Sequence, residues 1–226
     1  MQREQSRKNG GPYAAERSRG GRPSAERAGD VDRRILDAGA ALLLEQGFEA
    51  TTCEQVAARA GAGKASIYSR YANKEELFEA VIRDYVRRSM ENDGRPYVMP
   101  TVQERLRVAG EDLLTHSLQP DVIGMMRAVV TTVYRMPDLA RLANQIGRDH
   151  CVRQMARAVA GDQTETMEVV ARASNLASKF IELAVVPHQM RALMGEDPAS
   201  LLDAALNGVD ESIALLSKGG WLDGWK

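Results

Sequence analysis

The sequence predicts an all-α protein of about nine helices, and three observations support this class. Hydrophobic residues make up 44% of the 226-residue chain, enough for a core, while aromatic residues make up only 5%. Apolar residues recur at spacings of three and four along most of the chain, which is the period of one helical face. β-branched residues nowhere alternate with polar ones in a run bounded by hairpin signals, so no strand is predicted.

Composition also argues against several classes of protein. The longest apolar stretches reach about seven residues, far below the ~20 that a membrane helix needs. The N-terminus is polar and arginine-rich, without the apolar segment of a secretory signal. Two cysteines and three histidines provide neither a disulfide framework nor the spacing of a zinc site. We therefore expect a cytoplasmic protein that has no bound metal or cofactor and no contact with a membrane.

The first 29 residues differ from the rest of the chain. They contain seven basic and three acidic side chains and almost no apolar ones. Such a segment buries too little surface to offset the entropy of ordering, so we expect a disordered basic arm over 1–29. The first helix is predicted over 30–45, where Ile35, Leu36 and Ala40 begin an apolar stripe, and Gly47 ends it.

Two short helices joined by a tight turn are predicted over 53–72. Thr52 and Gln55 have the spacing of a capping box at the start of the first helix. Gly61 suits a left-handed turn that lets two helices meet at a steep angle. In the second helix, 64–71, Ile67 and Tyr71 face inward, and the other positions form a slim polar face. Such a face suits the major groove of DNA, so the segment is predicted to be a helix-turn-helix.

A fourth helix is predicted from the cap residue Asn73 to about Arg88. The Gly- and Pro-containing segment 91–100 then separates an N-terminal domain, 30–90, from a second helical domain, 101–218. Five helices are expected in the second domain, over 101–118, 120–135, 137–160, 163–185 and 198–217. The last two carry apolar seams at alternating spacings of four and three, typical of helix–helix packing. Each seam faces either the chain's own core or a second copy.

Residues 30–88 resemble the DNA-binding domain of the tetracycline-repressor (TetR) family of bacterial transcription regulators. The matching segments are ILDAGAALLLEQGFEATT, AARAG, KASIY and NKEELF. Downstream, MRAVVTTVYRMPDLARL is similar to regulators related to the AcrR and AefR groups. The resemblance implies an N-terminal three-helix DNA-binding domain followed by a ligand-binding and dimerisation domain.

By this resemblance, each residue of the helix-turn-helix surface has an expected role. Thr52 presents its hydroxyl and nearby helical N–H groups to a phosphate, and Tyr68 donates its hydroxyl to another. Lys74 contacts the DNA backbone from the start of the fourth helix. The recognition helix opens with Lys64, Ala65 and Ser66 near base edges or phosphates, and places Ser69 and Arg70 on the groove side.

The resemblance further implies a homodimer that binds a double-stranded, pseudo-palindromic operator as a repressor and is released by a small apolar ligand. The expected dimer interface is the two seams: Ala173, Leu176, Phe180, Leu183, Leu202, Leu206, Val209, Ile213 and Leu216. The candidate pocket residues are polar or soft side chains on otherwise apolar faces: His116, Met126, Tyr134, His150 and Asn175.

The net charge of −1 is compatible with the predicted DNA binding, because phosphate attraction depends on charge within a Debye length of about 10 Å. The basic arm is either a solubilising extension or a contact to phosphates or the minor groove. Other readings are a ligand-independent architectural or replication-linked factor, a helical adaptor that contacts protein, and an enzyme. The enzyme is disfavoured because the sequence has no nucleophile elbow, Gly-rich phosphate loop or metal-ligand cluster.

Overall fold

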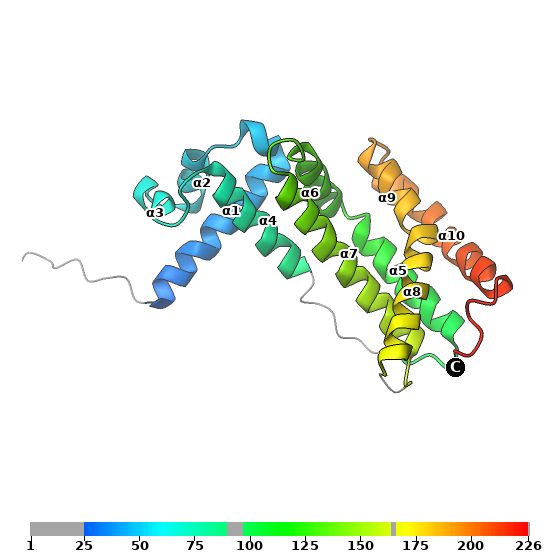
Figure 1. Cartoon of the computed structure of the whole chain (residues 1–226). Coiled ribbons are helices and arrows are strands. Elements are labelled where there is room, and N and C mark those ends of the chain that lie inside the picture. The colour runs from blue at the N-terminus through cyan, green and yellow to red at the C-terminus, as the bar shows by residue number, and fades with distance from the viewer. Residues whose placement is uncertain (1–24, 90–96, 164–165, 226) are drawn as a thin grey trace, which may run out of the picture.

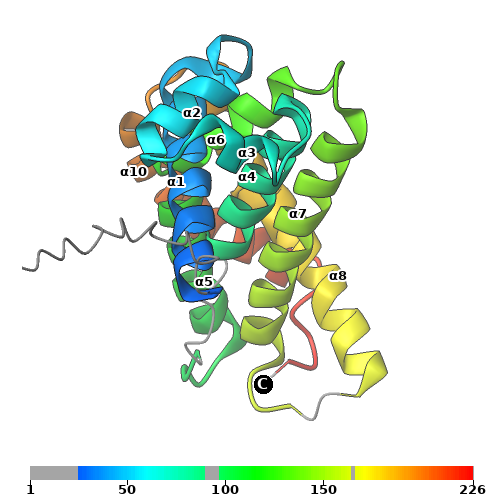
Figure 2. The same cartoon turned by 90° about the vertical axis from the view of Figure 1, so that its left-hand side faces the viewer.

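The computed structural model describes residues 25–89, 97–163 and 166–225, and side chains from residue 29 onward. These ranges contain ten α-helices and no strand. Figure 1 shows an elongated arrangement, with α1–α4 at one end, α8–α10 at the other, and α6 and α7 between them. The view along the long direction in Figure 2 shows α2 and α3 standing in front of the remaining helices.

The N-terminal helices are α1 (Ala25–Ala50), α2 (Cys53–Ala60), α3 (Lys64–Tyr68) and α4 (Lys74–Ser89). Because α1 begins at Ala25, residues 25–29 are helical, where we expected the disordered arm; residues 1–24 lie outside the described ranges. Gly47 has φ +75° and ψ 178°, so the backbone leaves helical geometry at the predicted residue. The second short helix ends three residues earlier than predicted, at Tyr68.

The core of this end is formed where the predicted apolar stripes meet. Ile35, Val56 and Ile67 have no exposed surface. Phe48 and Phe78 meet edge to face with ring centroids 5.1 Å apart, a favoured geometry for aromatic pairs. The same cluster takes in three side chains from beyond the predicted domain boundary, namely Met125, Ala128 and Leu139.

The C-terminal helices are α5 (Val102–Ser117), α6 (Pro120–Thr131), α7 (Pro137–Ala160), α8 (Met167–Ala184), α9 (Val186–Leu193) and α10 (Pro198–Lys218). Prolines stand in the first turn of α6, α7 and α10, as predicted, because a missing N–H costs nothing there. The eight-residue α9 was not predicted. None of the described helices is long and apolar enough to cross a membrane.

The seams of α8 and α10 mainly form the core of the protein itself. Both helices pack on α5 or its neighbours, and Phe180 lies so close to Gly110 that a Cβ there would be 2.7 Å from the Phe180 Cζ atom. The predicted dimer interface is therefore corrected at five positions, whose side chains are at most 5% exposed and form the core of one chain: Ala173, Leu176, Phe180, Val209 and Ile213. Leu216 is also buried, but it lines a surface hollow between α8 and α10. Leu202 and Leu206 are half-buried, and Leu183 is 44% exposed.

Candidate nucleic-acid interface

The turn between α2 and α3 is built as the sequence predicts. The Thr52 backbone N–H donates to Gln55 Oε1 at 2.9 Å, and the Gln55 N–H donates to Thr52 Oγ1 at 3.2 Å. Gly61 ends α2 with φ 61° and ψ 33°, a left-handed conformation that glycine adopts without strain. Arg34 of α1 donates to the Ala60 carbonyl at 3.0 Å. The Gly61 turn and the Arg34 hydrogen bond therefore stabilise the end of α2, from which the chain turns into α3.

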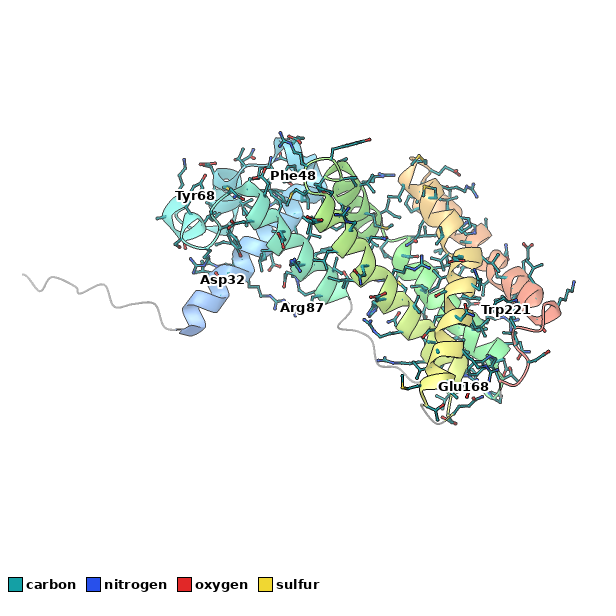
Figure 3. All side chains as sticks on the ribbon, viewed as in Figure 1. Asp32, Phe48, Tyr68, Arg87, Glu168 and Trp221 are labelled. Carbon is teal, nitrogen blue, oxygen red and sulfur yellow. The ribbon has the colours of Figure 1, made fainter. Side chains whose placement is uncertain are left out.

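α3 presents a polar face to solvent at one end of the molecule. Ile67 is fully buried beneath it, whereas the Tyr68 side chain is 49% exposed and projects at the end opposite Trp221 (Figure 3). Lys64, Ala65 and Ser69 are also exposed, and Ser66 is half-buried. Together with Thr52, which is exposed at the start of α2, they form a surface of amines, hydroxyls and small side chains that can approach DNA.

Glu54 of α2 reaches this surface and contacts two of the predicted DNA-binding residues. Its Oε1 atom lies 3.2 Å from Lys64 Nζ and accepts a hydrogen bond from the Tyr68 hydroxyl at 3.1 Å. Its own backbone amide, Lys64 and Tyr68 lower the pKa of Glu54, and the Glu54 carboxylate raises the pKa of Tyr68. Sequence reasoning missed this contact because residues ten and fourteen positions apart meet only through the interhelical angle.

Arg70 does not lie on the groove side, which corrects the prediction. Its Nε atom donates to Asp32 Oδ1 of α1, and its Nη1 atom donates to the Ser66 carbonyl at 2.8 Å. The side chain is 26% exposed. Arg70 follows the end of α3 and therefore links this segment to α1 through Asp32.

Lys74 lies at the start of α4, where the resemblance places a contact to the DNA backbone. Its Nζ atom donates to the Glu49 carbonyl at 3.1 Å and lies 4.3 Å from the centroid of the Phe48 ring. A lysine ammonium has three N–H donors, so it can hold this position and still contact a phosphate. Asn73 caps α4 as predicted, accepting from the Glu76 N–H at 2.8 Å.

The five candidate ligand residues do not gather in one site. Tyr134 is 99% exposed, and His116 and Asn175 are exposed on α5 and α8. Because these three side chains are exposed, they cannot line an interior pocket, and the prediction is wrong for them. Helical spacing alone did not show which face of each helix is turned outward. Met126 and His150 are half-buried on α6 and α7, and Met126 packs against the C-terminal core. In the part of the chain that the structure describes, no three His, Cys, Asp or Glu side chains group to hold a metal.

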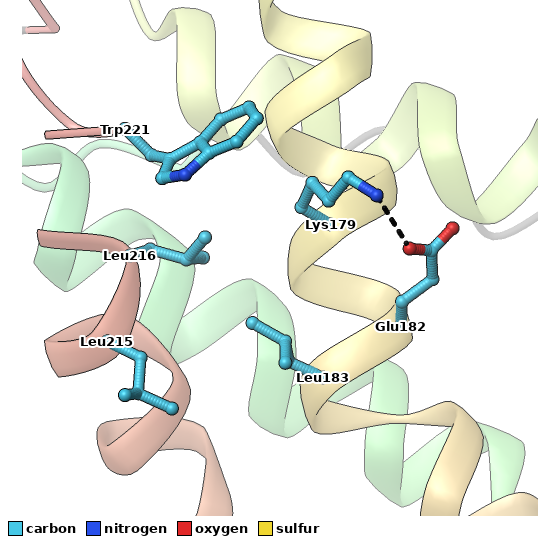
Figure 4. A pocket seen from close by; sticks show the side chains of 6 residues that line it. All are labelled: Lys179, Glu182, Leu183, Leu215, Leu216 and Trp221. Atoms are coloured by element: carbon cyan, nitrogen blue, oxygen red, sulfur yellow. Dashed lines mark hydrogen bonds and ion pairs between the residues drawn. The ribbon is translucent and has the colours of Figure 1, made fainter. Parts of the chain in front are cut away.

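A shallow apolar hollow lies between α8 and α10 at the opposite end from α3. Leu183, Leu215 and Trp221 line it, with the ion pair of Lys179 and Glu182 at its rim (Figure 4). These three apolar side chains are 44%, 60% and 41% exposed. A second hollow beside it includes Asn175 together with Arg172 and Trp225.

Comparison with known proteins agrees with the described geometry. Residues 35–81 match the family model for bacterial regulatory proteins of the tetR family. Residues 104–216, half of the chain, match the C-terminal domain of AefR-like transcriptional repressors. The HTH-type transcriptional regulator YvkB of Bacillus subtilis is 37% identical over 55 residues, which are 24% of this chain and 29% of that protein. The match thus spans less than a third of that relative's length.

Solved structures show the same fold. A protein of Mesorhizobium loti assigned to the TetR-family transcriptional regulators has a TM-score of 0.65 and 17% identity, over 84% of this chain and 98% of that one. The flavonoid-responsive regulator FrrA has a TM-score of 0.64 and 23% identity, over 84% and 97%. FadR of Bacillus subtilis, solved with stearoyl-CoA, has a TM-score of 0.50 and 14% identity, over 80% and 98%. The helix-turn-helix end and the matched C-terminal half together show that this chain belongs to the TetR family of DNA-binding transcriptional regulators.

Proposed function

We propose that the chain acts as a dimeric repressor that binds a pseudo-palindromic operator through α3 and is released by a small apolar ligand. One observation carries the DNA-binding part: α3 buries Ile67 while leaving Lys64, Ala65, Tyr68 and Ser69 exposed at one end. A helix with this division can enter a major groove without loss of core packing.

The roles of the exposed side chains are tested on DNA selected by the full chain from a randomised duplex library. Tyr68→Phe and Lys74→Ala should each weaken binding to all duplexes alike, by roughly fivefold, because each removes a phosphate contact worth about 1 kcal/mol. Lys218→Ala is the matched control for Lys74→Ala, since Lys218 is exposed in the last turn of α10, at the opposite end of the molecule (Figure 1). Lys64→Ala should also change the preferred bases. If Tyr68→Phe relaxed one base position alone, the assigned roles would be wrong.

The dimer is proposed on the surface around the α8/α10 hollow. Most buried seam residues lie outside it, but the exposed Leu183, Leu215 and Trp221 line the hollow together with the buried Leu216. Exposed apolar patches on soluble proteins mark interaction sites, and two copies related by a twofold axis can bury the same patch on each. Two recognition helices would then address half-sites about one helical turn apart.

Sedimentation velocity tests the dimer. The full chain should sediment as a dimer, and Leu215→Glu should give monomers because it places a charge in the apolar patch. Val130→Glu should leave the dimer intact, since Val130 is 57% exposed but lies on α6. A wild-type chain that stays monomeric at every concentration would refute the dimer and the palindromic operator together.

The ligand part is supported by the match to an AefR-like repressor domain and by two relatives of the same fold, one named as flavonoid-responsive and one solved with stearoyl-CoA. Of the five candidate residues, Met126 and His150 are the half-buried ones, and we propose that they contact the ligand. A thermal-shift screen of apolar compounds, followed by release of the protein from selected DNA, tests this. Stable occupancy of many genomic sites with no releasing compound would favour the ligand-independent factor.

A further inference from the structure

We propose that Glu54 limits the sequence-independent DNA affinity of this protein by competing with DNA phosphates for the Lys64 ammonium and the Tyr68 hydroxyl. The inference rests on the DNA-binding role proposed above for α3, and it assigns a function to an acidic residue at the centre of that surface.

The geometry is a three-residue contact between two helices. The Glu54 carboxylate lies 3.2 Å from Lys64 Nζ and 3.1 Å from the Tyr68 hydroxyl, and the side chains of Glu54 and Lys64 are 43% and 68% exposed. Both partners are therefore within reach of solvent and of a duplex. A carboxylate and a phosphate are acceptors of the same kind, so the two compete for the same donors.

The charges around α3 make this competition important. Besides Lys64, the predicted DNA-binding residues include two basic side chains, Arg70, which is bonded to Asp32, and Lys74, which is bonded to the Glu49 carbonyl. Of these three cationic groups, the Lys64 ammonium is the one that pairs with a carboxylate of the DNA-facing surface, that of Glu54. While Glu54 holds it, Lys64 neutralises less of the charge of a phosphate.

The consequence is a restraint on binding to any duplex. Sequence-independent affinity comes from phosphates neutralised by Lys and Arg, each of which adds about 0.9 to the slope of log affinity against log salt. A carboxylate that retains Lys64 removes part of one such contact and repels the backbone. Binding then depends more on the base contacts of α3.

The experiment measures fluorescence anisotropy of the full chain on a labelled duplex of random sequence, over a range of salt concentrations. Glu54→Gln removes the charge but keeps an oxygen that can accept from Tyr68. It should tighten binding about two- to fivefold, the range that an exposed ion pair covers, and steepen the salt slope towards one further phosphate.

Two further variants separate this mechanism from a general charge effect. Glu75→Gln removes the same charge from the first turn of α4, from a residue that bonds neither Lys64 nor Tyr68, and should change affinity less than Glu54→Gln. In a Lys64→Met background, Glu54→Gln should lose most of its gain, because the competed ammonium is absent. Thermal unfolding of each variant checks that the fold is retained.

The outcomes are distinct. If wild type binds the random duplex and Glu54→Gln binds no tighter, or gains no more than Glu75→Gln, the role of Glu54 is refuted while DNA binding by α3 stands. The same conclusion follows if the gain persists in full without Lys64. If neither wild type nor Glu54→Gln binds any duplex, the proposed function and this inference both fail.

Discussion

The two ends of the molecule expose surfaces of opposite chemistry. At the α3 end, the exposed side chains are polar or small, with the Glu54 carboxylate beside the Lys64 ammonium and the Tyr68 hydroxyl. At the α8/α10 end, Leu183, Leu215 and Trp221 remain exposed around a hollow. The first surface suits a polyanion, and the second suits an apolar partner such as another copy of the chain. The two surfaces lie at opposite ends of the molecule, as the positions of Tyr68 and Trp221 show (Figure 3).

The ends also differ in how they are held together. Arg70 ties the end of α3 to α1 through a partly buried ion pair with Asp32, which solvent can still reach. In the C-terminal domain, Arg105 is 3% exposed and donates to the carbonyls of Ala158 at 2.6 Å and Val159 at 3.2 Å. It thereby satisfies carbonyls at the end of α7 that no helical N–H can reach. Salt ions and phosphates can compete for the solvent-accessible ion pair of Arg70, whereas they cannot reach the buried hydrogen bonds of Arg105.

The largest expected effect comes from the buried arginine. Arg105→Met should lower the free energy of unfolding by about 3 kcal/mol, because it leaves buried carbonyls without donors. Urea unfolding followed by circular dichroism measures this. Arg107→Met is the matched control, two residues along α5, where the ion pair with Asp210 is exposed and worth at most about 1 kcal/mol. Equal losses of unfolding free energy in the two variants would contradict the distinction between buried and exposed arginine contacts.

Close packing of the C-terminal core gives the next effect. Gly110→Ala should destabilise the protein by about 1–3 kcal/mol, because the new Cβ atom would lie 2.7 Å from Phe180 Cζ and the core has no room to yield. Gly147→Ala in α7 should instead stabilise by about 0.5–1 kcal/mol, since a Cβ there meets no described atom within 4 Å and alanine favours a helix. Thermal unfolding of both variants should show shifts of opposite sign.

The corrected role of Arg70 predicts a smaller effect. Arg70→Met should cost about 1 kcal/mol of stability and leave the preferred operator bases unchanged, because the guanidinium contacts Asp32 and the Ser66 carbonyl. Asp32→Asn should produce a similar loss, and the double variant should lose less than the sum of the two. If Arg70→Met alone changed the preferred bases, the result would show that Arg70 contacts DNA and would contradict its assigned structural role.

The smallest effect is a pH dependence that originates in the C-terminal domain. Burial, and secondarily Arg191, lower the pKa of His188, and its buried Nδ1 atom has no hydrogen-bond partner among the described residues. The folded state therefore binds this proton less well than the unfolded state, so stability falls as pH drops through the ordinary histidine range. Unfolding between about pH 7.5 and pH 5.5 should show a loss that His188→Gln reduces and His116→Gln, at an exposed position, does not.

The comparison of the two ends also shows where sequence patterns were sufficient. At the helix-turn-helix, the signals are local: Thr52 and Gln55 cap each other, Gly61 adopts the left-handed turn, and Ile67 faces the core. In the C-terminal domain, the seam of α8, which contains Phe180, and the seam of α10, which contains Val209, have a period that suits both a dimer and an internal core. Periodicity identifies the apolar face of a helix but not which neighbour covers it.

The sequence alone determined the helical class, the caps and turns, the apolar faces of the first helix and of α8 and α10, and the family to which the chain belongs, because those depend on residues close together or on a shared motif. Tertiary structure decided which stripe became core, and brought Glu54 to Lys64 and Arg70 to Asp32. Such contacts depend on angles between helices, which are set by the packing of the whole core rather than by any local run of residues.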